Sequence, residues 1–218
     1  MSGERRCVTE WKNRYPGADI WVPGGGASLN FVEPGFFEDK ITLGVNEVYR
    51  RFRCTCLVRR AQWRAEEAWQ SGIPLIQSEY ESGNLAGMRI EVSGRSWYFT
   101  HVCRALHLPV DLSVVGSDMI AVGASIMVSA LHLAAYMGAR NILVCGHDCG
   151  SLDGQLTFDN YYDEPISDTV AYWRATNRFE AESVAMRQRL KEVYGCRVYS
   201  LNPFLNFGLE GHCYRREP

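Results

Sequence analysis

The chain of 218 residues is long enough for one large domain, and 46% hydrophobic and 22% charged residues are ordinary values for a globular protein. A net charge of −2 argues against a protein that coats nucleic acid non-specifically and leaves a local basic face open. No apolar run approaches the roughly 18 residues that span a bilayer, and the first residues lack the apolar core of a secretory signal. We therefore expect a cytoplasmic protein without a membrane span, whose eight irregularly spaced cysteines are free thiols.

In the first half of the chain, short apolar runs alternate with polar and helical segments. The composition predicts strands over residues 18–22, 40–46, 54–58 and 73–77. Residues 61–70, "AQWRAEEAWQ", have a helical composition and end at Ser71-Gly72. The predicted elements of the first half of the chain are therefore strands joined by helices or turns.

The most regular segment of the chain follows a polar stretch that runs from about residue 78 to 115. Within that stretch, two β-rich runs flank Ser93-Gly94, which predicts a hairpin. Residues 124–138, "ASIMVSALHLAAYMG", are nearly all apolar and stop at a glycine. They predict a buried helix with a glycine at its C-terminal end.

A strand over 139–146, a long amphipathic helix over 169–195 and a strand over 196–201 complete the chain. Strands that alternate with helices at this spacing predict an α/β fold with a doubly wound, mostly parallel sheet and helices on both faces. We expect an N-terminal extension over 1–17, one domain over 18–202 with an irregular insertion over 78–115 and a lid over 151–168, and a C-terminal tail over 203–218.

Three consecutive glycines, Gly24, Gly25 and Gly26, directly follow the first predicted strand. A glycine triplet loses much conformational entropy on folding, so it needs a reason. In open α/β sheets ligands bind beyond the carboxyl ends of the strands, and bare main chain there lets amides donate to phosphate oxygens. Ser28 adds a hydroxyl donor or caps the next turn. A tight turn is the alternative, because the motif is neither G-x-G-x-x-G nor a Walker A loop.

Other small or polar residues are expected at the same edge of the sheet. Asn46 ends the second predicted strand, where it either contacts a base or ribose or caps the next turn. Ala124 and Ser125 start the buried helix, where unpaired amides favour anions. Gly146 and Asp148 follow the next strand, where they either meet a ligand or form a turn. Together with the glycine triplet, these features favour a nucleotide site.

The order of these motifs resembles a known family. The segments "GGGASL" (24–29), "GVN" (44–46), "GASIMVSALHLAAYMGARNILVCGHD" (123–148) and "LDG" (152–154) are similar to those of the 6-hydroxymethylpterin diphosphokinase-like domains. The same pattern resembles the bacterial sialyltransferases that use CMP-sialic acid and the glycosyltransferases associated with flagellin modification. The resemblance spans roughly residues 18 to 202, and the block from the buried helix to Asp148 is its most specific part.

The resemblance implies a Rossmann-like nucleotide-dependent transferase. Carried over to this sequence, it implies nucleotide contacts by Gly24, Gly26, Ser28, Asn46, Ala124 and Ser125, with Gly146 beside the base or the reaction centre. We also expect nucleotide contacts by Gly25, Leu29 and Tyr161. Asp148 would then lie beside the base or the reaction centre. The sequence departs from the family pattern in two places: Gly25 stands where the sialyltransferases have Asn, and Ala27 stands where both groups usually have Pro.

Glycosyl transfer needs a base that deprotonates an acceptor hydroxyl and donors that stabilise the leaving phosphate. The candidate catalytic residues are Asp148, His147, Tyr162 and His212. The resemblance to the sialyltransferases implies a late histidine as the base, and His212 is the only histidine after Asp148. Tyr161 and Tyr162 either contact the phosphate or pack in a lid.

Three functions remain open at this point. The first is a glycosyltransferase that uses a CMP- or UDP-type nucleotide sugar. The second is a diphosphokinase that uses Mg²⁺ and ATP on a pterin-like alcohol, with Mg²⁺ held by carboxylates chosen from Asp148, Asp153, Asp159 and Asp163. The third is a nucleotide-binding module without catalysis.

The partners follow from charge and cysteine spacing. Six arginines lie in residues 49–64. They form either a solvated helix face or a basic face that meets an anionic acceptor. The identity of the acceptor stays open between a glycan, a protein and a nucleic acid. Homo-oligomer formation stays open. "CTC" (54–56) and "CGHDC" (145–149) lack the Cys-x-x-Cys pairs of a structural zinc site, so we expect no metal centre.

Overall fold

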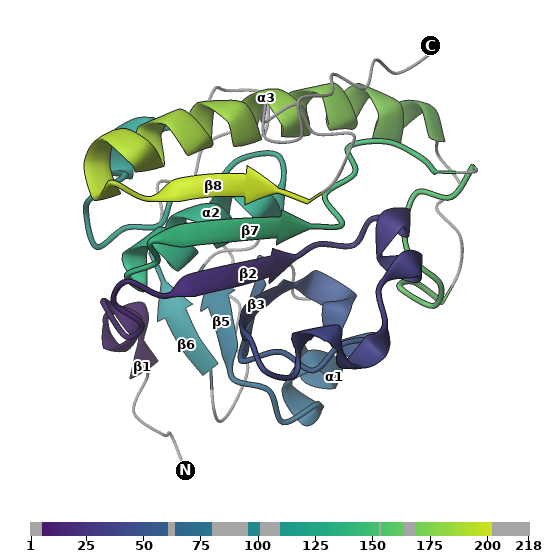
Figure 1. Cartoon of the computed structure of the whole chain (residues 1–218), viewed down its shortest axis with the longest axis horizontal. Helices are drawn as coiled ribbons and strands as arrows, with labels where there is room; N and C mark the ends of the chain where they lie inside the picture. The colour runs from purple at the N-terminus through teal and green to yellow at the C-terminus, as the bar shows by residue number, and fades with distance from the viewer. Residues whose placement is uncertain are drawn as a thin grey trace.

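The computed structural model describes residues 6–60, 64–79, 96–100, 110–152, 154–163 and 169–201, with side chains from residue 178 onward in the last range. Within these residues, eight strands form one sheet whose neighbouring strands are all parallel (Figure 1). The strands are β1 (Arg6–Cys7), β2 (Asp19–Pro23), β3 (Ile41–Val45), β4 (Cys56–Arg59), β5 (Leu75–Ser78), β6 (Ser96–Phe99), β7 (Asn141–Cys145) and β8 (Arg197–Ser200). The predicted Rossmann-like α/β fold is confirmed.

The helices in the described part of the chain are of two kinds. The α-helices are α1 (Ala65–Gln70), α2 (Ile126–Tyr136) and α3 (Thr169–Tyr194). The short 3₁₀ helices are η1 (Val8–Trp11), η2 (Ala27–Phe31), η3 (Pro34–Phe37), η4 (Asn46–Arg50) and η5 (Leu112–Val114).

The strand order, β1-β6-β5-β4-β3-β2-β7-β8, contains one reversal that matters for function. From β2 the chain moves outward through β3, β4, β5 and β6, and then it returns to place β7 on the other side of β2. The loops after β2 and β7 therefore leave in opposite directions. In open parallel sheets such a reversal leaves a crevice beyond the carboxyl ends of the strands, where ligands bind.

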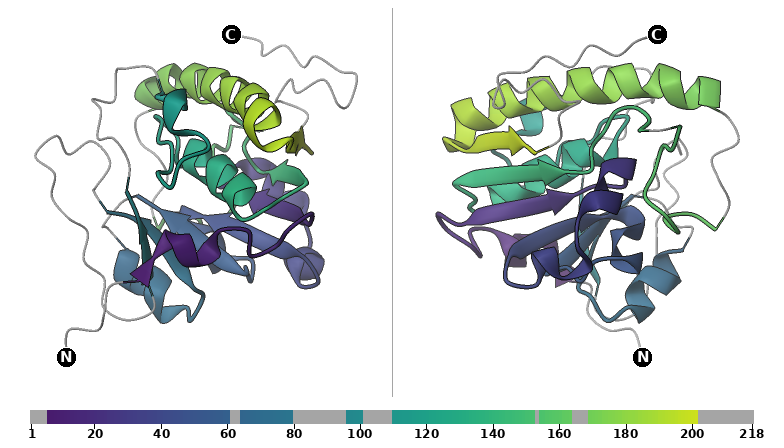
Figure 2. Two further views of the ribbon diagram at one scale, coloured as in Figure 1. Left: turned by 90° about the vertical axis from the view of Figure 1, so that its left-hand side faces the viewer. Right: turned by 45° about the vertical axis from the view of Figure 1, so that its right-hand side comes forward.

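Each face of the sheet packs against a different set of elements. Alternate strand residues, among them Ile20, Val22 and Leu43, join the core that includes α2. Residues of the opposite parity, such as Leu57 and Leu75, join a second core with η2, η3, η4 and α1. Figure 2 shows α2 and α3 on one side of the sheet and α1 on the other. Both faces are thus covered, as parallel sheets require.

Helix α2 lies where the apolar run and its end signals predict it. All 11 of its residues are buried, and burial of each large aliphatic side chain contributes about 1.5–3 kcal/mol. The Ser125 hydroxyl oxygen accepts from Met127 N (3.1 Å) and caps the first turn. Gly138, with φ +96°, ends the helix in the left-handed region that favours glycine.

Several predicted boundaries need correction. Residues 78–115 are not wholly an insertion, because Ser96–Phe99 form β6 of the sheet. β6 pairs in parallel with β5 on one side and β1 on the other, so residues 96–99 are not an arm of the hairpin predicted around Ser93-Gly94. Ser93-Gly94 itself lies outside the described residues. Within the predicted extension over 1–17, residues 6–17 belong to the fold, since β1 joins the sheet and Val8 and Trp11 are buried.

Candidate functional site

A cleft of about 280 Å³ lies at the carboxyl ends of the central strands. In Figure 1 the arrows of β2 and β7 point to the right, and the segment that follows β7 lies beyond their tips. Most of the residues predicted for the site line this cleft: Gly24, Gly25, Gly26, Asn46, Ala124, Ser125, Gly146, His147, Asp148, Tyr161 and Tyr162. The cleft lies next to the reversal between β2 and β7.

The glycine turn after β2 is bonded to the turn after β7. Gly24 N donates to the Cys145 carbonyl and Gly26 N to the Gly146 carbonyl, both at 2.7 Å. These two amides therefore already have acceptors in this structure, and a phosphate contact of the glycine turn stays a prediction. A ligand phosphate needs donors from another part of the cleft.

Protein atoms explain why this turn has no side chains. A Cβ on Gly25 would come within 2.6 Å of the Tyr161 ring, and one on Gly26 would collide with the Asp148 carboxyl group. Gly146, with φ +61°, packs against Leu29, where a Cβ would overlap the Leu29 side chain. Leu29 is buried in the second core and lies outside the cleft lining. The triplet is needed for close packing at the edge of the cleft.

Asp148 is buried at the cleft and fixes the start of η2. Its Oδ1 accepts from the Ser28 hydroxyl (2.6 Å), and its Oδ2 accepts from Ser28 N (2.8 Å). Both donors of Ser28 are therefore directed at Asp148 in this structure, and a ligand contact of Ser28 stays a prediction. The carboxylate itself lines the cleft.

His147 is held by α3 and is a poor candidate for the general base in this arrangement. Its Nε2 lies 2.9 Å from the Ser183 hydroxyl, and the ring makes a further hydrogen bond to the Phe179 backbone. Burial lowers the pKa of His147 to about 4. The imidazole is neutral at pH 7, and its polar contacts attach the loop after β7 to α3. His212, the other histidine candidate, lies outside the described residues.

The two tyrosines have different environments. Tyr161 is buried over Gly25, and its hydroxyl contacts the Asn46 side chain and the Glu47 backbone. Burial raises the pKa of Tyr161 well above its usual value, so it stays protonated. Tyr162 packs edge-on against Tyr161, with the ring centroids 4.6 Å apart, and is partly exposed. Burial raises the pKa of Tyr162 to about 12.

Asn46 adopts a left-handed conformation (φ +52°) between β3 and η4. Asparagine tolerates this region better than most residues. Cys149, which also lines the cleft, has φ +49°, an uncommon backbone conformation for cysteine. Such conformations occur often at functional sites.

The arginine run between β3 and α1 does not form a solvated helix face. Arg59 is fully buried and pairs with the fully buried Glu47 at 2.9 Å. Arg60 follows β4 and lines the cleft. The sequence interpretation missed Arg60, although its position directly after an apolar strand is the same signal that identified Asn46.

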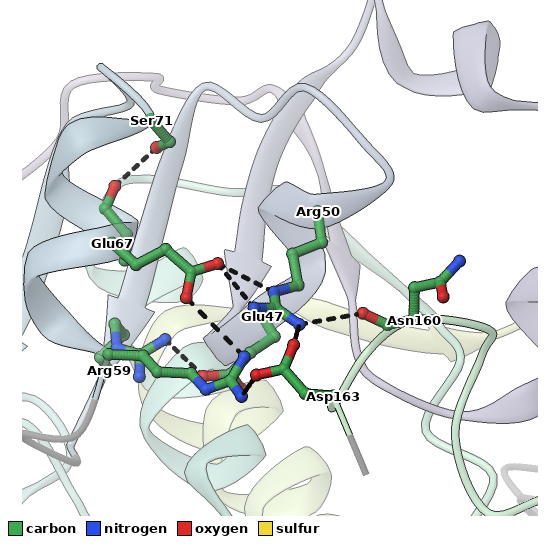
Figure 3. Close-up of polar contacts among 9 residues, drawn as sticks. Glu47, Arg50, Arg59, Glu67, Ser71, Asn160 and Asp163 are labelled. Atoms are coloured by element: carbon green, nitrogen blue, oxygen red, sulfur yellow. Dashed lines mark hydrogen bonds and ion pairs between the residues drawn. The ribbon is translucent and has the colours of Figure 1, made fainter. Parts of the chain in front are cut away.

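Residues 154–163 supply part of the cleft lining and are held by contacts at several points. Phe158 N donates to the Gly25 carbonyl, and Asp159 N donates to Asn30 Oδ1. Figure 3 shows Arg50 between Glu67 and Asp163; its Nη1 lies 2.8 Å from Asp163 Oδ1. Arg64 also pairs with Asp163. We call residues 154–163 the lid segment, since they carry Tyr161 and Tyr162 over the cleft.

No group of three or more histidine, cysteine or acidic side chains placed to hold a metal ion occurs among the described residues. Cys54, Cys56, Cys145 and Cys149 are buried, and none of these four forms a disulfide within the described part of the chain. Burial raises the pKa of Cys145 to about 12, as for an inert structural thiol.

Comparisons with known proteins leave the family undetermined. No protein-family model and no curated protein matches the chain. Among solved structures, the chain is similar to the epimerase Mth375 from the thermophilic pseudomurein-containing methanogen Methanothermobacter thermautotrophicus, with 13% identity and a TM-score of 0.24. The match covers 88% of this chain and 53% of that chain, so the chain spans about half the length of that protein. A similarity at this level carries no argument about function.

None of the helices in the described part of the chain is long and apolar enough to cross a membrane.

Proposed function

We propose that the chain is an enzyme, a nucleotide-dependent transferase whose cleft binds a phosphorylated nucleotide donor. The position of the cleft supports this: it lies where the strand order reverses, and the loops after β2, β3 and β7 and the start of α2 meet there. Ligands of open parallel sheets bind at such points. A volume of about 280 Å³ is near the lower end of the range for small-molecule sites, as expected with the lid segment in place.

The chemistry of the cleft fits a ligand that carries both a phosphate and hydroxyl groups. The positive end of α2 attracts a phosphate. The Asp148 carboxylate is an acceptor of the type that binds ribose or sugar hydroxyls, and it already accepts from a hydroxyl of the protein. Tyr162 offers a partly exposed aromatic ring on which a base or a sugar can stack.

Glycosyl transfer is the reaction that we propose first. The acceptor oxygen forms a bond to the anomeric carbon, the bond from that carbon to the phosphate oxygen breaks, and the acceptor proton passes to a base. The start of α2 would stabilise the leaving phosphate. Asp148 is our candidate for the base, because the ring of His147 is engaged with Ser183 and Phe179.

A nucleotide-binding module without catalysis is the second candidate, and the environment of His147 favours it. This histidine is the described imidazole in the cleft, and its ring contacts Ser183 and Phe179 of α3 and the Cys149 sulfur. A protein with this arrangement binds a nucleotide but lacks a histidine base unless an undescribed residue supplies one.

The test is a thermal-shift screen with CMP, CDP, UDP, GDP and ATP, each with and without Mg²⁺. A ligand at 100 times its Kd stabilises the folded state by about 2.7 kcal/mol, which is measurable as a higher unfolding temperature. Stabilisation by CMP, CDP or UDP without metal, followed by turnover of the matching nucleotide sugar, is the expected result. Nucleotide binding without turnover supports the second candidate, and stabilisation by ATP with Mg²⁺ alone supports a diphosphokinase. A chain that none of the nucleotides stabilises would contradict the proposal.

A further inference from the structure

Arg60 is a buried cation at the wall of the cleft. The side chain is only 7% exposed and lies just beyond the carboxyl end of β4. Its Nη1 donates to the Gly123 carbonyl, and its Nη2 donates to the Ala124 carbonyl at 3.2 Å. The guanidinium group therefore lies against the loop that leads into α2.

No carboxylate pairs with Arg60 in the part of the chain that the structure describes. Several other arginines in this part of the chain have such partners: Arg59 pairs with Glu47, Arg50 with Glu67, and Arg178 with Glu182. The Nε of Arg60 is buried and has no hydrogen-bond partner. A buried charge is costly unless an opposite charge and hydrogen bonds satisfy it, so this arrangement is that of a site for an external anion.

The acid that attracts Arg60 is already engaged elsewhere. Glu182 Oε2 accepts from Ala124 N (2.8 Å), and Glu182 Oε1 lies 2.9 Å from Arg178 Nε. Glu182 attracts Arg60 over a longer distance without a hydrogen bond to it. Burial lowers the pKa of Arg60 to about 10, which leaves the guanidinium charged at neutral pH.

The first turn of α2 adds a second, independent attraction for an anion. The helix has 11 residues, and its positive end faces the cleft through Ser125 and Ile126. The Ser125 hydroxyl accepts from Met127 N, so its own proton is available for donation. The guanidinium fork and the helix end thus converge on one part of the cleft.

We propose that Arg60 and the first turn of α2 form the subsite that binds the phosphate group of the ligand, an inference that rests on the proposed nucleotide-binding function. A guanidinium binds phosphate oxygens through two parallel N–H groups. This orientation leaves the sugar and base of the ligand toward Asp148 and the glycine turn, where hydroxyl acceptors lie.

The test compares Arg60→Gln and Arg60→Lys with the wild-type protein in calorimetric titrations. The probes are CMP, UDP, inorganic pyrophosphate, and the nucleosides cytidine and uridine. We expect Arg60→Gln to weaken binding of the phosphate-bearing probes by about 10- to 100-fold, because a hydrogen bond to a charged group is lost. Arg60→Lys, which keeps the charge and loses the fork, should weaken it by a smaller factor. Nucleoside affinity should not change.

Arg51→Gln is the matched control. Arg51 also donates to two main-chain carbonyls, those of Asn30 and Val32, but it lines a different groove. Its loss should leave the affinity for phosphate-bearing probes unchanged, which separates the role of Arg60 from a general loss of structural contacts.

The outcomes distinguish this inference from the proposed function. Nucleotide affinity that is equal in wild type and Arg60→Gln overturns the inference and leaves the function standing. Pyrophosphate binding that depends on Arg60, without nucleotide binding, supports the subsite and contradicts the function. A wild-type protein that binds none of the phosphate-bearing probes overturns both. If Arg60→Gln does not fold, the test uses Arg60→Lys alone. Binding of the phosphate-bearing probes by Arg60→Lys with the affinity of the wild-type protein then overturns the inference.

Discussion

At the residue scale, the glycine triplet shows how a sequence signal and its structural cause differ. The bare main chain predicted contact with a ligand, whereas Gly25 and Gly26 provide space for Tyr161 and Asp148. The position of the turn at the cleft was predictable from a strand followed by glycines. The packing partners were not, because they come from a segment more than 100 residues later in the chain.

Gly25→Ala should destabilise the protein through overpacking. The added Cβ would come within 2.6 Å of the Tyr161 ring, and overpacking of this kind costs about 1–3 kcal/mol. Urea unfolding measures the loss. Gly35→Ala is the control, because its Cβ would meet only the Glu38 side chain at 3.7 Å, and it should stay within about 0.5 kcal/mol of wild type. Equal stability of the two variants would contradict the packing described for the triplet.

Arg60 illustrates a residue that the sequence could have revealed. The run "CTCLVRR" places two arginines at the end of an apolar strand. At the carboxyl edge of a parallel sheet this position favours a ligand contact, as it did for Asn46. Composition favoured a solvated helix face because arginine is seldom buried. The ion pair of Arg59 with Glu47 and the position of Arg60 in the cleft depend on tertiary contacts that no local pattern encodes.

At the scale of elements, the strands and helices with strong local signals were predictable. β2, β3, β7, α2 and α3 lie within a few residues of their expected ranges. The two-residue β1 and the 3₁₀ helices carry no periodicity of their own, so they were missed. The hairpin around Ser93-Gly94 failed at β6 because strand pairing is decided by distant partners, here β1 and β5.

The lid segment gives a prediction at this scale. Asp163→Asn removes the ion pairs with Arg50 and Arg64, whose guanidinium groups also hold the pKa of Asp163 below its usual range. We expect faster hydrogen exchange at the Phe158 and Tyr161 amides, because the segment opens more often. High salt should produce the same change in the wild-type protein.

Asp39→Asn is the control for the lid segment. It removes a surface pair with Lys40 and leaves the lid contacts intact. Exchange at Phe158 and Tyr161 that is the same in wild type, Asp39→Asn and Asp163→Asn would show that the ion pairs do not hold the lid segment.

At the scale of the whole molecule, two buried histidines link stability to pH. Burial lowers the pKa of His132 and of His147 to about 4, while an unfolded histidine titrates near 6.5. Between these values the unfolded chain binds protons that the folded chain excludes. The contribution of these two histidines to stability is therefore complete above about pH 7.5 and is lost as the pH drops toward 4.

At pH 5.5 each histidine should lower the free energy of unfolding by about 1.4 kcal/mol relative to pH 7.5. Urea unfolding at the two pH values measures the difference. His132→Gln and His147→Gln should each remove about half of it, whatever their stability at pH 7.5. A wild-type protein equally stable at both values would show that these histidines titrate normally in the fold.

The proposed function requires that the cleft at the reversal of strand order binds a phosphorylated ligand. The most direct measurement is hydrogen exchange with and without the nucleotide that stabilises the protein most. We expect slower exchange in residues 24–26, 123–127 and 146–149 and in the lid segment, and no change in the second groove, which Lys40, Arg51 and Arg53 line. Protection in that second groove, with residues 123–127 and 146–149 unchanged, would contradict the claim.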